Sequence, residues 1–163
     1  MTDEIKRAYQ KALFLLERRD YSEAEMRQKL KDKDFSLDTI EVVLERLIAY
    51  GFINDRRFTE QYLRYHSNAY SKRILSMKLF QKGISSDLFE TVYSNMSEEF
   101  GRSPEEEALE KAVSAALRKA ERRGAEIHAL TPEEQNKIIA SLFRKGFSIN
   151  QIRYEMKKAV ESC

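Results

Sequence analysis

Seven basic residues lie in the middle of the 163-residue sequence, close to tyrosines at helical spacing. The basic residues are Arg56, Arg57, Arg64, Lys72, Arg73, Lys78 and Lys82, and the tyrosines are Tyr62, Tyr65 and Tyr70. One interpretation is a surface for phosphates or acidic groups, because cations attract the charge and aromatic rings offer stacking faces. The other is a solvated helix face beside core tyrosines, which these residues alone favour because tyrosines at helical spacing usually belong to a core.

The distribution of charge supports the first interpretation weakly. Residues 51–97 contain seven Lys or Arg against four Asp or Glu. Residues 1–50 contain ten against eleven, and residues 98–163 contain twelve against twelve. The net charge of +2 therefore arises in the middle of the chain, as a mild bias and not as a basic tail.

The sequence offers no set of residues for catalysis or metal binding. His66 and His128 are far apart and have no cysteine or acidic partner at ligand spacing. A glycine-rich phosphate loop and a Ser/His/Asp motif are also missing. The acidic run at residues 105–107 could bind a divalent ion, but a solvated helix start is favoured. We expect no enzyme activity, no metal and no cofactor.

Helical periodicity dominates the chain and predicts an all-α protein. Charged residues make up 34% of the sequence, whereas glycine (5) and proline (2) are scarce. The stretch GFINDRRF at residues 51–58 interrupts this pattern. Gly51 suits the left-handed residue that ends a helix, and Asn54 or Asp55 can cap the next one.

Three segments share one pattern and indicate an internal repeat. They read SEAEMRQKLKDKDF (22–35), SKRILSMKLFQKGI (71–84) and IIASLFRKGFSINQI (138–152). Leu30, Leu79 and Leu142 occupy equivalent positions, so we expect all three to be buried. The two later segments continue with a Lys-Gly-apolar-Ser turn, in which serine can cap the following helix.

We therefore predict three tandem three-helix repeats at residues 1–50, 51–97 and 98–163, forming an elongated, curved molecule. The first helices are expected at 3–19, 55–69 and 104–124. A flexible joint is expected at residues 94–104. Capping boxes are expected at residues 103–106 and at residues 131–134, both with proline at the first helical position.

Features that would point to a membrane or to export are missing from the sequence. No run approaches the roughly 18 apolar residues of a membrane span, and the charged start does not resemble a signal peptide. Cys163 is the only cysteine, so an internal disulfide is impossible. We expect a cytoplasmic monomer with no membrane partner.

The repeated segments resemble the RecX family, bacterial regulators of the RecA recombinase. SEAEMRQKLKDKDF, LIAYGFINDRRFTEQYL, LFQKGI and LFRKGFSINQI carry the resemblance, which covers nearly the whole chain. Two positions depart from the family pattern: Asp34 stands where the family usually has glycine, and Lys78 where it often has an acid.

The resemblance implies a non-catalytic protein that binds the RecA–DNA filament, along its groove, and curbs filament growth, ATP hydrolysis and strand exchange. Direct contact with single- or double-stranded DNA stays open. An alternative is an autonomous helix-turn-helix DNA-binding protein. Only the helix expected at 149–160 is basic enough for that role, with Arg153, Lys157 and Lys158.

Overall fold

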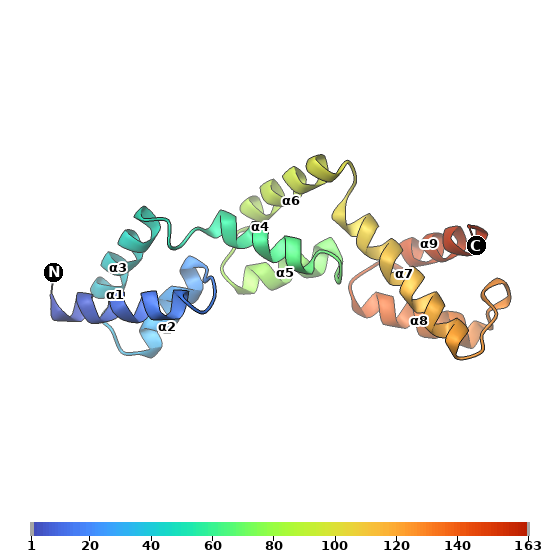
Figure 1. Ribbon diagram of the computed structural model, residues 1–163, viewed down its shortest axis with the longest axis horizontal. Coiled ribbons are helices and arrows are strands. Elements are labelled where there is room, and N and C mark those ends of the chain that lie inside the picture. The colour runs from blue at the N-terminus through green and yellow to red at the C-terminus, as the bar shows by residue number, and fades with distance from the viewer. Residues whose placement is uncertain (1, 163) are drawn as a thin grey trace. The chain divides into compact units, whose positions relative to one another are not determined.

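The computed structural model describes residues 2–162, and these residues form nine α-helices and one short 3-10 helix without any strand. Figure 1 shows them in chain order. Their bounds are α1 Asp3–Leu16, α2 Glu23–Asp32, α3 Leu37–Ala49, α4 Asp55–His66, α5 Lys72–Gln81, α6 Ser86–Phe100, α7 Pro104–Arg122, η1 Ile127–Ala129, α8 Pro132–Arg144 and α9 Ile149–Glu161. The all-α prediction is confirmed, whereas Cys163 lies outside the described residues.

Short polar side chains start the helices, because the first N–H groups of a helix have no partner within it. The hydroxyl of Ser22 accepts a hydrogen bond from the Glu25 amide, and a full capping box forms there. The box expected at residues 131–134 is also formed. Ser103 caps α7 through the Glu105 amide, but among the described residues it does not complete the expected box.

The same tight turn joins the second and third helices of each repeat. Gly83 and Gly146 adopt positive φ angles of 85° and 96°, where glycine is free of Cβ strain. Asp34 takes the equivalent place in the first repeat with φ 63°, and is the one non-glycine residue with positive φ in residues 2–162. The repeat pattern thus describes the backbone correctly in all three places.

Each outer repeat has its own apolar core. In the first repeat, α1 and α2 pack on α3 around a buried cluster that includes Leu30. In the third, α7, α8 and α9 pack together around a cluster that includes Leu142. Leu30, Leu79 and Leu142 are 0%, 0% and 2% exposed, which confirms the prediction of equivalent burial.

Two expectations about helix lengths were wrong. The segment expected to be a flexible joint at residues 94–104 is helical as far as Phe100, and Met96 within it is buried. The helix continues there because Met96 extends its apolar face. The first helices of the repeats end at Leu16, His66 and Arg122, a few residues before the expected ends.

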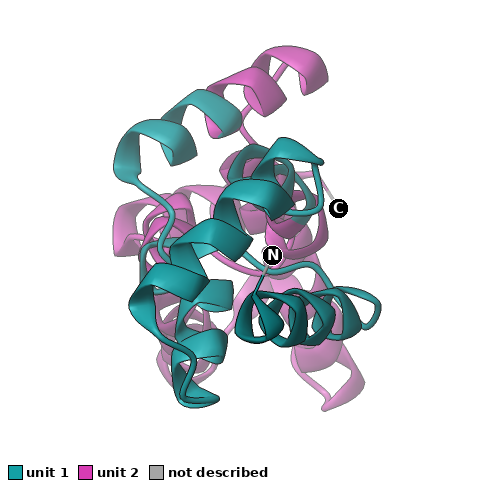
Figure 2. Cartoon of the chain, turned by 90° about the vertical axis from the view of Figure 1, so that its left-hand side faces the viewer, with its two compact units in different colours: residues 1–61, 78–92 teal, residues 62–77, 93–163 magenta. Residues whose placement is uncertain are grey.

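The chain divides into two compact units that do not coincide with the repeats (Figure 2). One unit comprises residues 1–61 and 78–92, and the other comprises residues 62–77 and 93–163. Each unit therefore combines an outer repeat with part of the middle one. The domain division at 1–50, 51–97 and 98–163 stays a prediction.

Replacing Leu79 with Ala should lower the free energy of unfolding by about 2–5 kcal/mol, because a fully buried leucine leaves a cavity. The matched control is the neighbouring Phe80→Ala, since Phe80 is 68% exposed and its removal should change stability by about 0.5 kcal/mol or less. Urea unfolding measures both. Equal losses for the two variants would contradict the burial of Leu79.

Candidate partner-binding surface

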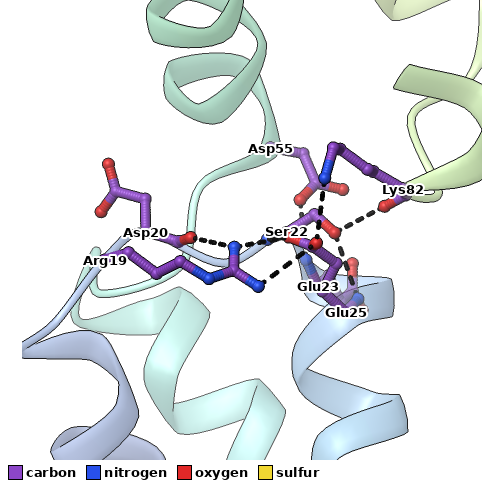
Figure 3. Close-up of polar contacts among 7 residues, drawn as sticks. All are labelled: Arg19, Asp20, Ser22, Glu23, Glu25, Asp55 and Lys82. Carbon is purple, nitrogen blue, oxygen red and sulfur yellow. Dashed lines mark hydrogen bonds and ion pairs between the residues drawn. The ribbon is translucent and has the colours of Figure 1, made fainter. Parts of the chain in front are cut away.

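The start of α2 is a contact point between the first and second repeats, within one compact unit. The Ser22 hydroxyl donates a hydrogen bond to the Lys82 carbonyl at 2.6 Å. The Glu23 amide donates to the Asp55 carboxylate at 2.9 Å. A Cβ at Gly83 would overlap the side chain of Ala24, so glycine is required for this close approach. We call these contacts the first joint (Figure 3).

Charged side chains surround the first joint. The Glu25 carboxylate lies 3.5 Å from the Lys82 ammonium and 3.4 Å from the Arg19 guanidinium. Arg19 also stacks over the Tyr21 ring at 3.7 Å. These ion pairs are partly exposed and so contribute little stability individually, but they hold Lys82 at the contact.

The second joint has a similar construction, with a backbone amide in place of the serine hydroxyl as donor, and lies within the other compact unit. The Ser71 amide donates to the Lys145 carbonyl at 3.0 Å. The Lys72 amide donates to the Glu105 carboxylate at 3.2 Å. A Cβ at Gly146 would overlap Ser71 and a neighbouring side chain. In both joints, a Lys-Gly turn and a first-turn acid of one repeat meet the start of the second helix in the preceding repeat.

The stretch GFINDRRF is explained by these contacts. Asn54 caps α4 by accepting the Arg57 amide at 3.0 Å, which resolves the choice between Asn54 and Asp55. The Arg57 guanidinium donates to the carbonyls of Gly51 at 2.9 Å and Phe52 at 3.4 Å. Arg57 thus fixes the connection between α3 and α4 through its carbonyls. Asp55 fixes the start of α4 through its contact with the Glu23 amide of α2.

The environment of Asp55 opposes its ionisation. Burial raises the pKa of the Asp55 carboxyl above its ordinary value of 3.8, and the negative charges of Glu23 and Glu25 raise it further. The hydrogen bond from the Glu23 amide and the charge of Arg27 act in the opposite direction. Asp55 thus supplies an acceptor oxygen at a place that disfavours its charge.

Three of the seven basic residues singled out in the sequence have structural contacts. Arg57 binds carbonyls at the end of α3, and Lys82 belongs to the first joint. The Lys72 ammonium lies 5.0 Å from the centre of the Tyr93 ring, and its amide belongs to the second joint. These residues position the repeats, a role that their charge did not reveal.

Three others are exposed. Arg56 pairs with Glu60 one helical turn away at 3.3 Å, and Arg64 pairs with Glu99 at 3.3 Å. Both pairs are solvated and so weak that a partner could replace them. Arg73 is exposed and has no ion pair within residues 2–162.

The remaining basic residue, Lys78, is half-buried in the same compact unit as Arg56. The seven residues are divided between the two units: four belong to the first and three to the second. The second set is Arg64, Lys72 and Arg73.

The tyrosines also divide between two environments. Tyr62 packs on His66 with ring centres 4.3 Å apart, and burial raises the pKa of its hydroxyl. Tyr65 is 82% exposed, so the interpretation of these tyrosines as core residues is wrong for Tyr65. An exposed tyrosine beside Arg64 is typical of a contact surface.

Two exposed phenylalanines at equivalent positions of the repeat are functional candidates that the charge pattern does not reveal. Phe80 and Phe143 both follow the buried leucine of the second helix, in LFQKG and LFRKG, and they are 68% and 56% exposed. The signal was present, because an apolar residue directly after a buried helical position lies outside the core face.

The third repeat carries a basic surface that was missed in part. A groove of about 330 Å³ between α7 and α8 is lined by Lys119, Arg123 and Lys137. Its one acidic lining residue, Glu134, is occupied by the Thr131 amide in the capping box. On α9, Arg153 and Lys157 are exposed, as are their neighbours Tyr154 and Lys158.

The acidic run at residues 105–107 has structural partners. Glu105 accepts the Lys72 amide, and Glu107 pairs with Lys111 at 2.9 Å. Among residues 2–162, no group of three or more His, Cys, Asp or Glu side chains is arranged to hold a metal ion. None of the described helices is long and apolar enough to span a membrane.

Replacing Asp55 with Asn should remove the pH-dependent free-energy cost of ionising a partly buried carboxyl. The substitution keeps an acceptor oxygen for the Glu23 amide. Because the folded pKa of Asp55 is raised, the wild type should be stabilised relative to Asp55→Asn below pH 3.8. This advantage is lost as the pH rises through the folded pKa. Asp55→Ala should instead cost about 1–3 kcal/mol at pH 7, because an amide loses its partner.

Urea unfolding between pH 3 and 7 measures these differences. Glu41 is the control of opposite sign, because the hydrogen bond from Arg27 lowers its pKa below the ordinary 4.5. The stabilising contribution of Glu41 is therefore present above pH 4.5 and is lost on acidification. The same pH trend in Asp55→Asn and Glu41→Gln would contradict the assignment.

Replacing Gly83 with Ala should disrupt the first joint, whereas Gly51→Ala should only strain the backbone. Both glycines have similar positive φ angles, 85° and 77°, so each substitution carries the same conformational cost of about 1–2 kcal/mol. A Cβ at Gly51 meets nothing within 4 Å, whereas one at Gly83 overlaps Ala24. Gly83→Ala should therefore lose about 1–3 kcal/mol more.

Amide hydrogen exchange at Glu23 provides a second measurement. The exchange rate should rise in Gly83→Ala, because the Glu23 amide loses its partner Asp55 when the joint opens. It should not rise in Gly51→Ala. If both variants lose the same stability and protect Glu23 equally, the close contact at Gly83 is refuted.

Known proteins share this sequence of three-helix domains. Models of the first, second and third three-helix domains of RecX match residues 8–47, 54–92 and 105–156, in that order. A regulatory protein RecX from Chlorobium phaeobacteroides is 29% identical over 159 residues, covering 96% of both chains. One from Vibrio vulnificus is 27% identical over 146 residues, covering 89% of this chain and 88% of the relative.

Solved structures agree with the sequence comparison. The crystal structure of RecX from Lactobacillus salivarius superimposes with a TM-score of 0.76 at 28% identity, covering 97% of each chain. A second structure, of a regulatory protein RecX, has a TM-score of 0.74 at 23% identity and supports the fold. With the three domain models in order along most of its length, this chain belongs to the RecX family.

Proposed function

We propose that this protein regulates DNA repair and recombination by binding the filament that the RecA recombinase forms on DNA. Binding curbs filament growth, ATP hydrolysis and strand exchange, and the protein acts in the cytoplasm as a monomer without chemistry of its own. The observation that carries the proposal is the ordered match of three RecX domains. The relatives are named regulatory proteins, which supports a role in regulation.

Equivalent residues in two repeats support a partner that is itself repetitive. Phe80 and Phe143 are exposed at the same repeat position, one residue away from the Lys-Gly pair that takes part in each joint. A filament presents the same protein surface once per subunit. Two equivalent phenylalanines suit two equivalent apolar pockets, and buried aromatic anchors contribute much of the energy in protein interfaces.

The exposed basic residues of the middle repeat supply the electrostatic part of the proposed contact. Arg56, Arg64 and Arg73 are exposed. The ion pairs of Arg56 with Glu60 and of Arg64 with Glu99 are solvated. Such charges accelerate association with an acidic surface or with phosphates more than they slow dissociation. Binding should therefore weaken as salt screens these charges.

Direct nucleic-acid binding is the second candidate function, and the third repeat favours it. The groove between α7 and α8 has three cations and an acid already used in a cap. Arg153 and Lys157 add two exposed cations on α9 next to an exposed tyrosine, Tyr154. Basic side chains with an aromatic ring are the usual elements of single-strand binding.

The protein should suppress ATP hydrolysis by RecA filaments preformed on single-stranded DNA, at or below one chain per RecA subunit. A coupled ATPase assay over a saturating titration measures this. A parallel binding assay with the same DNA, lacking RecA, separates the two candidate functions. An unchanged ATPase rate together with tight DNA binding would replace the first candidate by the second.

The triple variant Arg56→Gln, Arg64→Gln, Arg73→Gln should slow association with the filament and flatten its salt dependence, because three exposed charges are lost. The matched control is Lys6→Gln, Lys29→Gln, Lys31→Gln, which removes three exposed charges from the first repeat. Both variants spare the joints, and circular dichroism verifies their fold. If the two variants slow association equally, the effect comes from the net charge of the protein, and the middle repeat is not the contact surface.

A further inference from the structure

The groove between α7 and α8 lies where the third repeat is longer than the second. α7 runs to Arg122, seventeen residues beyond Glu105, the acid of the second joint. α4 ends at His66, only eleven residues beyond Asp55, the acid of the first joint. The last turns of α7 therefore have no counterpart in α4, and they form one wall of the groove. The joints take no atoms from this wall.

The floor of the groove is apolar. Ala116 and Ala120 lie one helical turn apart on α7, and Ile138 comes from α8. The two alanines are partly buried against the core of the repeat, to which Ile138 belongs. Apolar surface of this kind is stabilised by contact with apolar side chains. A partner with apolar side chains along its contact face therefore suits the floor.

Three cations stand around the floor, and we call them the rim cations: Lys119 and Arg123 of α7 and Lys137 of α8. All three are exposed, and none has an ion pair within residues 2–162. The one acid that lines the groove, Glu134, accepts the Thr131 amide in the capping box. Lys119 and Arg123 suit the negative end of the α7 dipole, but Lys137 lies in the middle of α8, where the dipole gives no such reason.

An apolar floor inside a basic rim is complementary to an acidic amphipathic helix. The apolar face of such a helix lies in the groove, and its acids beside that face reach the rim cations. Lys119 and Arg123 are four residues apart, which is also the spacing of acids on successive turns of a partner helix. Charge and apolar surface are then both used.

Nucleic acid would use the charge alone. Its phosphates can neutralise the rim cations but leave the apolar floor without a partner. Single-strand binding relies on aromatic rings that stack with bases, and none of the eight residues that line the groove is aromatic. The lining thus favours a protein helix over a nucleic acid.

We propose that the groove between α7 and α8 is a docking site for an acidic amphipathic helix of a partner protein. This contact is additional to the exposed phenylalanines and to the arginines of the middle repeat, and it does not depend on the identity of the filament. The cations of α9 beside Tyr154 do not line the groove and stay available for the second candidate function.

Fluorescence anisotropy with three labelled probes and the full chain tests the proposal, at about 0.1 M salt so that distant charges are screened. The first probe is a peptide of about 18 residues, long enough to form a helix, with leucines along one face and glutamates beside them. The second has the same composition in an order without an apolar face, and the third is an oligothymidylate of equal net charge. The first probe should bind roughly tenfold more tightly than the second, because only its leucines can cover the floor together.

The rim variant is Lys119→Gln, Arg123→Gln, Lys137→Gln. It should bind the first probe roughly tenfold or more weakly than the wild type, because three exposed ion pairs together supply that much. The matched control removes three exposed cations of the same repeat that do not line the groove, and it should keep most of the affinity. The control is Arg118→Gln, Arg122→Gln, Arg144→Gln.

A floor variant separates the groove from its charge. Ala120→Gln places a polar side chain on the floor without changing the net charge, so it should also weaken binding of the first probe. Circular dichroism verifies the fold of each variant, and Ala116→Gln replaces Ala120→Gln if that variant does not fold.

A preference for the first probe that the rim and floor variants abolish, and that the control keeps, supports the proposal. Equal binding of the two peptides overturns it, because the apolar floor then has no part in binding. Equal losses in the rim variant and the control, or a preference that the floor variant keeps, place the contact elsewhere and also overturn it. Oligothymidylate that binds alone and is released by the rim variant assigns the groove to the second candidate function instead. These assays contain no RecA, so their result is separate from that of the ATPase titration.

Discussion

The Glu23 amide lies at the start of a helix whose cap, Ser22, is fully buried, and its hydrogen-bond partner comes from the next repeat. A buried amide without a partner is costly, so the carboxylate of Asp55 must reach it. The remaining features of the first joint follow from this requirement. Gly83 lacks a Cβ because the helix start lies against it, and Arg57 holds the end of α3 so that α4 begins in the right place. The second joint meets the same requirement with Glu105.

Local rules explain why most of the fold could be predicted from the sequence. Caps, left-handed glycines and the spacing of buried leucines each act over a few residues, so they are visible in a single sequence. The joints are not visible in this way. Asp55 accepts an amide 32 residues away, and an acid at the start of a helix already has a local explanation through the helix dipole. Without the structure, Asp55 was a possible cap and nothing more.

The candidate surface was harder to predict for a related reason. Charge identifies residues that can reach solvent, but it does not show which of them bind backbone carbonyls, as Arg57 does. Tyrosines have the same ambiguity, because helical spacing alone favours a core for Tyr65, which is 82% exposed. Phe80 and Phe143 are predictable from the repeat alone, because each directly follows the buried leucine of its second helix.

The third repeat shows where this architecture can change in length. Leu79 and Leu142 are separated by 63 residues, against 49 between Leu30 and Leu79. The additional residues lie in α6, α7 and α8, which have 15, 19 and 13 residues against 13, 12 and 10 in α3, α4 and α5, and in the connection containing η1. The turn at Lys145 and Gly146 keeps its spacing from the buried leucine. The differences in length between the repeats of this chain therefore lie outside the turn and its spacing from the buried leucine, and repeats of unequal length share one mode of attachment.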